Sequence, residues 1–145
     1  RYRRVLKAFS KFPGQVEVEI LESSYNNNFE RTKEIVDKLR AAQILCAVDD
    51  FGTGYSCLNI LSKLNVDTIK FDRSLLPVNA EDKATYLYEN MSQLCNKLGF
   101  SVVAEGVESP FHVDYIATLP VNLMQGYYFD MPLTLEQAMR RYSSS

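Results

Sequence analysis

The stretch ILCAVDDFGTGYSCLNILSKLNVDTIKFD, residues 44–72, predicts a strand, a loop, a helix and a second strand. Residues 44–48 are a short continuous apolar run, which is typical of a strand buried on both faces. Three leucines recur at the spacing of one helical face, so we predict a helix over residues 55–64. Residues 68–71 are the next strand. A strand–helix–strand unit of this kind indicates parallel strands covered by helices.

The same alternation continues toward both ends of the chain. Further strands are predicted at residues 16–21 and 101–104, a turn into a last strand at residues 124–129, and further helices at residues 28–43, 81–98, 111–119 and 135–142. Because no long linker or change of composition interrupts the alternation, we expect one α/β domain over residues 1–145 with no internal boundary. Two architectures fit this pattern: an open doubly wound sheet, or part of an eight-stranded (β/α) barrel.

The composition is that of an ordinary globular protein. The chain has 145 residues, of which 46% are hydrophobic and 23% charged, and its net charge of −2 creates no strong attraction for nucleic acid or anionic membrane. No apolar run approaches the ~18 residues that span a bilayer, and none follows the basic start RYRR, which we interpret as a solvated helix start. We expect a cytoplasmic segment without membrane contact, which leaves room for membrane anchorage of the parent protein through upstream segments.

Cysteine and histidine offer little chemistry in this sequence. Cys46, Cys57 and Cys95 are odd in number and form no CxxC or Cys/His cluster, so we expect neither a disulfide framework nor structural zinc, but small buried apolar side chains. The single histidine, His112, follows a proline in SPFHVDY. No nucleophile motif accompanies it, so we predict a surface or half-buried helix residue rather than a catalytic base.

Polar side chains stand near the C-terminal ends of the predicted strands, the edge at which βα proteins bind ligands. They are Glu19, Glu22, Asp49, Asp50, Lys70, Asp72, Glu105, Glu108 and Gln125. Several carboxylates buried together need compensating cations, and oxygen ligands suit Mg²⁺ or Mn²⁺ better than zinc. Two such ions roughly 3.5–4 Å apart are a common device for phosphodiester hydrolysis.

Single members of this set also have simpler explanations. An alternating strand would place Glu19 in solvent, the Asp49–Asp50 pair suits a turn, and Gln125 suits a backbone contact in a turn. Lys70 is harder to explain in this way, since a lysine inside a buried strand needs partners. Their joint placement at the strand ends favours a metal-binding site over these separate explanations.

Four segments resemble the motifs of the EAL domain, the bacterial cyclic di-GMP phosphodiesterase, in the order of that family. VEVEILES at residues 16–23 is similar to its ExxE strand, residues 48–76 to its DDFGTGYS region, VVAEGVES at 102–109 to its AEGVE motif, and MQGYYFDMPL at 124–133 to its QGYxFxxP ending. The resemblance covers essentially the whole chain. It implies the C-terminal five βα units of a TIM-like (β/α)8 barrel, without the strand that carries Glu-Ala-Leu.

The resemblance also implies roles for the polar residues at the strand ends. Glu19, Asp49 and Asp50 would ligate two Mg²⁺ or Mn²⁺ ions. Lys70 would contact the attacking water or the phosphate, and Glu105 would be the general base or a partner of the metal site. The implied reaction is attack of metal-activated water on phosphorus, which opens cyclic di-GMP to pGpG.

Three further residues receive supporting roles from the resemblance. Gln125 would help to place the metals and the substrate, and Glu22 and Glu108 would support the loop over residues 50–56. Leu21 stands where the family usually has threonine, so one hydrogen bond near that loop is expected to be absent.

A barrel without three of its strands has two exposed edges, so we expect a homodimer or pairing with the missing barrel portion. Alone, the chain is expected to hydrolyse cyclic di-GMP weakly or not at all. The main alternative is a non-catalytic, cyclic di-GMP-binding regulatory module of the same family. A phosphoacceptor receiver domain is disfavoured, because Lys70 lies on the strand directly after the acidic pair and Gln125 stands where the receiver lysine would be.

Overall fold

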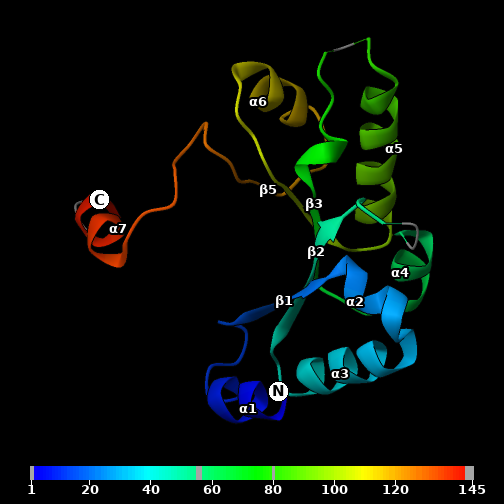
Figure 1. Ribbon diagram of the computed structural model, residues 1–145, viewed down its shortest axis with the longest axis vertical. Coiled ribbons are helices and arrows are strands. Elements are labelled where there is room, and N and C mark those ends of the chain that lie inside the picture. Colours follow the sequence, from blue (N-terminus) through cyan, green and yellow to red (C-terminus); the bar gives the residue numbers. More distant parts are fainter. Residues whose placement is uncertain (1, 55–56, 80, 143–145) are drawn as a thin grey trace.

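The computed structural model describes residues 2–54, 57–79 and 81–142, which form one curved parallel sheet with helices packed against it (Figure 1). The strands are β1 (Glu17–Leu21), β2 (Leu45–Phe51), β3 (Thr68–Phe71), β4 (Ser101–Ala104) and β5 (Leu123–Met124). Every neighbouring pair is parallel, and the order in the sheet is the order in the sequence. A doubly wound sheet reverses its strand order, so this sequential order is that of part of a (β/α) barrel.

Helices follow the strands as the sequence predicts. They are α3 (Phe29–Ala41), α4 (Cys57–Lys63), α5 (Lys83–Lys97), α6 (Pro110–Ile116) and α7 (Leu135–Tyr142). The Asn28 side chain caps α3 by accepting from the backbone N–H of Arg31, and Gly99 follows α5 with a φ of 85°. Positions 55 and 56 of the predicted helix over 55–64 lie outside the described residues.

Three further helical elements accompany these units. Helix α1 (Tyr2–Phe9) includes the basic start of the chain, with Arg3 and Arg4 exposed. Helix α2 (Glu22–Asn27) begins directly after β1 and was not predicted. The 3₁₀ helix η1 (Arg73–Leu75) follows β3 and is capped by the side chain of Asp72, which accepts from the backbone N–H of Ser74.

The core lies between the sheet and the helices that Figure 1 shows on one side of it. All four residues of β3 are buried. The Phe51 and Phe71 rings stack with centroids 5.6 Å apart, and Tyr88 of α5 meets Phe71 edge-on at 5.2 Å. Cys46 and Cys95 are buried, as predicted, whereas the side chain of Cys57 lies outside the described residues.

The prediction for residues 124–129, a turn into a last strand, has the two elements in the wrong order. Strand β5 ends at Met124, and the chain then turns, with the backbone N–H of Phe129 bonded to the carbonyl of Gly126 at 3.1 Å. A side chain at position 126 would collide with the backbone of Val107, so glycine permits the turn to pack against the loop after β4. This turn ends the pairing that a longer strand would have continued.

Strands β1 and β5 are the edges of the sheet, and the part of the chain after β5 leaves much apolar surface exposed. Helix α7 stands away from the sheet in Figure 1. Its Leu135, Met139 and Tyr142 are exposed, and so is Met131 before it. Among the helices that the structure describes, none has both the length and the apolarity to span a membrane.

Candidate active site

A β-bulge in β2 creates the centre of the site. Val48 pairs with Ile69 and Phe51 pairs with Phe71, so Asp49 and Asp50 together oppose the single residue between those partners on β3. Asp50 takes a φ of 56°, in the left-handed region that aspartate tolerates better than most residues. Neighbouring side chains of a regular strand point to opposite faces of the sheet. The bulge instead lets both carboxylates turn to the same side.

Lys70, the residue opposite the bulge, is the cation of the site. Its Nζ lies 2.7 Å from Oδ1 of Asp49, 2.8 Å from Oε1 of Glu19 and 2.9 Å from Oε1 of Glu105. The lysine side chain is only 9% exposed, whereas Glu19 is 51% exposed. These three contacts, from β1, β2 and the end of β4, supply the partners that a lysine inside a buried strand needs.

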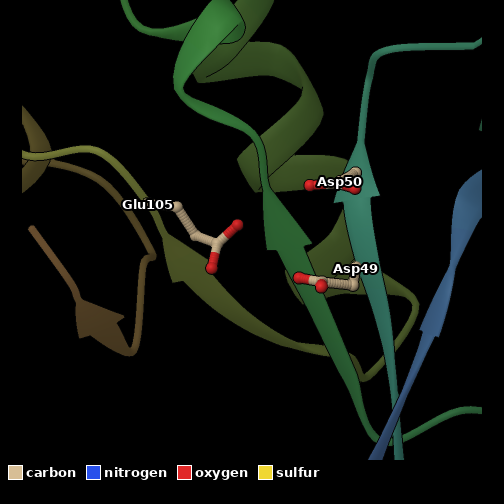
Figure 2. A group of neighbouring side chains, drawn as sticks. All are labelled: Asp49, Asp50 and Glu105. Carbon is tan, nitrogen blue, oxygen red and sulfur yellow. The ribbon is translucent and has the colours of Figure 1, made fainter. Parts of the chain in front are cut away.

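Three of the carboxylates form a compact group. Asp49, Asp50 and Glu105 each offer an oxygen within 4.8 Å of the others. Figure 2 shows Asp49 and Asp50 at the end of β2 and Glu105 at the end of β4, on either side of β3 and directed toward it. Such a set of oxygens from neighbouring strand ends fits a hard divalent cation. Glu19 lies outside this group and joins it through Lys70.

The electrostatics of the group agree with a need for cations. Burial raises the pKa of Asp50, and the neighbouring carboxylates of Asp49 and Asp72 raise it further. Burial also raises the pKa of Glu105, although Lys70 opposes that shift. Burial alone would lower the pKa of Lys70, but its hydrogen bonds to the carboxylates outweigh burial and raise it, so the ammonium stays charged.

The side chain of Glu22 contacts the loop after β2. The residue is fully buried at the start of α2, and its Oε2 accepts from the backbone N–H groups of Gly52 at 2.9 Å and Gly54 at 3.1 Å. Two bonds from one carboxylate fix the described part of the loop, residues 50–54, beside the acidic pair. Residues 55 and 56 of the expected loop lie outside the described residues.

Glu108 follows β4, and its expected support of the loop over residues 50–56 stays a prediction. The residue is exposed, lines a cavity with Arg73 and His112, and has no hydrogen bond from its side chain to the described residues 50–54. Its backbone N–H is bonded to Nδ1 of His112 at 3.3 Å. His112 is half-buried on α6, as predicted for a helix residue.

Gln125 lies directly after β5, and its backbone continues the ladder beside β4. Its N–H is bonded to the carbonyl of Ala104 at 2.8 Å, and its carbonyl accepts from Val107 at 3.1 Å. The residue is exposed and lines a cavity with Arg73 and Tyr127. The simpler interpretation, a backbone contact in a turn, therefore also describes what Gln125 does.

The sequence did not reveal the bulge or the position of Asp72. Asp72 follows a strand like the other acidic residues, but its side chain caps η1. Its negative charge also raises the pKa of Asp50. An aspartate at the N-cap position is itself a capping signal that could have been used. No local signal marks a bulge, because it depends on pairing with β3.

The chain is similar to known proteins over most of its length. The EAL domain model matches residues 2–132 of the chain. Among curated proteins, the cyclic di-GMP phosphodiesterase NbdA of Pseudomonas aeruginosa is 34% identical over 131 residues, which cover 88% of this chain and 17% of NbdA.

Solved structures give the same result for the fold. The EAL domain protein from Listeria monocytogenes superposes with a TM-score of 0.88 at 30% identity, covering 99% of this chain and 59% of that protein. Klebsiella pneumoniae BlrP1, solved as a manganese/cyclic di-GMP complex, gives a TM-score of 0.82 at 29% identity, covering 90% of this chain and 34% of BlrP1. The chain therefore spans less than two thirds of each of these proteins.

Proposed function

The chain belongs to the EAL domain family, and we propose that it forms part of a metal-dependent phosphodiesterase that hydrolyses cyclic di-GMP to pGpG. The observation that carries this proposal is the group formed by Lys70 with the carboxylates of Asp49, Asp50 and Glu105. The names of the relatives support the substrate, since NbdA is a cyclic di-GMP phosphodiesterase and BlrP1 was solved with the dinucleotide and manganese.

In this proposal, Asp49 and Asp50 hold two divalent cations, Mg²⁺ or Mn²⁺, and Glu19 completes their ligands. The raised pKa of Asp50 supports the assignment, because a cation offsets the cost of burying like charges together. Bound ions of this type supply Lewis acidity and a water of lowered pKa. Glu19 is the most exposed of the carboxylates around Lys70, so it can leave the ammonium to ligate an ion without a large cost in burial.

Lys70 and Glu105 act on the substrate side of the site. Lys70 keeps its proton and donates to a phosphoryl oxygen, which stabilises the negative charge that grows there during attack on phosphorus. Glu105 accepts the proton of the attacking water, and its raised pKa brings its basicity closer to neutral pH. Gln125 positions substrate from the end of β5.

The rest of the barrel is proposed to come from outside this chain. Both edges of the sheet are open, and helix α7 and its preceding segment expose apolar side chains that a closed barrel would cover. Either a second copy or the preceding barrel portion closes these edges, and the isolated chain is weakly active or inactive. We place the domain in the cytoplasm and treat residues 1–145 as one partial domain.

A chimera tests the proposal. Residues 1–132 replace the matching part of NbdA, and conversion of cyclic di-GMP to pGpG is followed by chromatography with Mn²⁺ and with EDTA. We expect Mn²⁺-dependent turnover that Asp49→Asn and Lys70→Met abolish, while Glu30→Gln, an exposed carboxylate on α3, has no effect. A folded chimera that binds cyclic di-GMP without hydrolysing it would instead support the non-catalytic regulatory module.

A further inference from the structure

The charge of the chain is unevenly distributed along the sequence. Residues 1–16, RYRRVLKAFSKFPGQV, contain five of the 16 basic residues and none of the 18 acidic ones. Their charge is therefore +5, and residues 17–145 carry the difference between 11 basic and 18 acidic residues, which is −7. The net charge of −2 conceals this separation, so it does not exclude a local attraction for an anionic partner.

Four basic side chains of this segment, on α1 and just after it, are exposed. They are Arg3, Arg4, Lys7 and Lys11. Within the described residues, none of the four has a carboxylate within 4.0 Å. On the neighbouring helix α3, by contrast, Lys33, Lys38 and Arg40 each contact a carboxylate. The cations of α1 therefore keep their charge for a partner outside the described chain.

Helix α1 presents its cations away from the core. Val5 and Leu6 are half-buried and pack against the core. Arg3 and Arg4 lie one helical turn before Lys7, so the three cations share the opposite face of the helix. This outward face is basic over the length of α1.

Two aromatic rings lie at the end of the basic face. Phe9 is 38% exposed and Phe12 is 48% exposed. Backbone hydrogen bonds fix the turn that carries Phe12, from its own N–H to the carbonyl of Phe9 at 2.9 Å and from the N–H of Gly14 to the carbonyl of Gln43 at 2.8 Å. Cations beside exposed aromatic rings are typical of segments at a membrane surface, where the rings enter the interface and the cations meet anionic headgroups.

This basic end of the molecule lies opposite the acidic group. The loop after Phe12 lines a cavity with Leu45 and Asp67, which stand at the N-terminal ends of β2 and β3, whereas the acidic group stands at the C-terminal ends of the strands. Figure 1 shows α1 at the lower end of the molecule and α6, which follows the C-terminal end of β4, at the upper end. An anionic surface would therefore attract the basic end and leave the acidic group facing solution.

We propose that residues 3–12 bind the surface of a membrane that contains anionic phospholipids. The inference replaces the expectation, based on net charge, of a segment without membrane contact, and it does not rest on the proposed function. Nucleic acid fits the surface less well, because binding of single strands combines a positively charged groove with stacked aromatic rings. Here the cations lie on one convex helix, and both rings lie at its end.

Sedimentation with vesicles tests the proposal. The 145-residue chain is mixed with vesicles of phosphatidylcholine alone, or of phosphatidylcholine with phosphatidylglycerol, in EDTA, so that no divalent ion bridges the acidic group to lipid phosphate. Each basic side chain near an anionic surface strengthens binding about fivefold. We expect the chain to sediment with the anionic vesicles, to stay in solution with the neutral ones, and to be released as the salt concentration rises.

Three variants locate the contact. Arg3→Gln with Lys7→Gln, and Arg4→Gln with Lys11→Gln, each remove two cations and are expected to weaken binding to the anionic vesicles at least about tenfold. Phe12→Ser keeps every charge and should weaken it about fivefold, because the exposed half of the ring no longer enters the interface. Circular dichroism confirms that each variant is folded.

Two controls address the rest of the surface. Lys83→Gln with Lys97→Gln removes two exposed cations from α5 and should bind the vesicles as the wild-type chain does. Met139→Ser removes an exposed apolar side chain from α7, whose two arginines already contact carboxylates, and should also leave binding unchanged.

Several results would overturn the inference. They are equal sedimentation with neutral and anionic vesicles, no sedimentation with either, and unchanged binding in both pairs that remove cations from residues 3–12. Loss of binding in Met139→Ser alone would assign the contact to α7 instead. Binding of a short DNA duplex, followed by fluorescence anisotropy, without binding to vesicles would assign the basic end to nucleic acid. Because no measurement uses cyclic di-GMP or metal, the phosphodiesterase can fail while the membrane contact stands, and the reverse.

Discussion

Nζ of Lys70 lies 2.8 Å from Oε1 of Glu19, although the two residues stand on strands separated by β2. The contact crosses β2 on the same side of the sheet as the carboxylate of Asp49, which also binds the ammonium. One side chain thus links three strand ends. Since Lys70 is their shared partner, the site depends on it even without bound metal.

Lys70→Met should therefore destabilise the metal-free chain. Removal of the ammonium leaves the carboxylates of Asp49 and Glu105 partly buried and unpaired. We expect the free energy of unfolding to fall by about 2–4 kcal/mol. This is less than is usual for a buried ion pair, because the third partner, Glu19, is half exposed. Urea unfolding at neutral pH measures the difference. The deficit should shrink in Mn²⁺, and a loss no larger than in the exposed-site control Lys97→Met would contradict the argument.

Divalent metal should raise the melting temperature of the wild-type chain. Ligand at 100 times its Kd stabilises the native state by about 2.7 kcal/mol, which corresponds to about 5–10 °C for a chain of this size. Asp50→Asn should abolish the shift, and asparagine tolerates the left-handed backbone at this position, so the variant tests the charge alone. Glu30→Gln should keep the shift. An Asp50→Asn protein that Mn²⁺ stabilises fully would exclude Asp50 as a ligand.

Glu22→Ala should loosen the loop after β2. The variant leaves the N–H groups of Gly52 and Gly54 without their carboxylate, at a cost of about 2–4 kcal/mol. Hydrogen exchange should accelerate at these two amides more than in the core of β3. Glu22→Gln retains an acceptor oxygen and should lose less. Equal exchange in all three proteins would show that the carboxylate does not hold the loop.

Gly106→Ala and Gly99→Ala form a matched pair. Both glycines have positive φ, but only a Cβ at position 106 collides with another residue, Arg73, while position 99 has open space. Gly99→Ala should cost about 1–2 kcal/mol for its backbone conformation alone. Gly106→Ala should cost at least about 3 kcal/mol, because the collision with Arg73 adds a cost of overpacking to the cost of the backbone conformation. Equal costs in denaturant unfolding would mean that the loop moves away without penalty.

Cys46 should resist alkylation in the folded chain, even in alkaline solution. Burial raises the pKa of its thiol to about 12, and the charge of Asp67 adds to the shift. The unfolded chain loses the thiol proton near pH 9, whereas the folded chain keeps it. The contribution of the buried Cys46 thiol to the free energy of unfolding is therefore intact below pH 9 and falls as pH rises toward 12. Mass spectrometry after iodoacetamide at pH 9 measures the modification. Rapid labelling of Cys46 without denaturant would contradict its burial.

The parallel sheet and its helices could be predicted from periodicity alone. The apolar run at 44–48, the helical spacing that follows it and Lys70 inside the next strand already describe a strand–helix–strand unit with a buried cation. The last strand was predicted to follow a turn within residues 124–129, whereas β5 ends at Met124 and the turn comes after it. Contact between Gly126 and the loop after β4 decides that region, and no pattern within residues 124–129 reports it.

Within the site, proximity was predictable and orientation was not. Parallel strands bring their ends to one edge, so Asp49, Lys70 and Glu105 were expected together, and their distances confirm it. Whether Asp50 would face the same side as Asp49 depends on the bulge opposite Lys70. The position of Glu108 depends on the loop after β4, whose Gly106 lies against Arg73 of η1, and this is a tertiary contact.

The sequential strand order also bears on how the chain folds. Each strand pairs with the one synthesised just before it, so no strand must wait for a distant partner. Contacts close in the sequence form quickly, and domains often begin to fold during synthesis from the N-terminal end. The sheet can therefore grow by one strand and one helix at a time, with the acidic pair meeting its lysine once β3 has emerged from the ribosome.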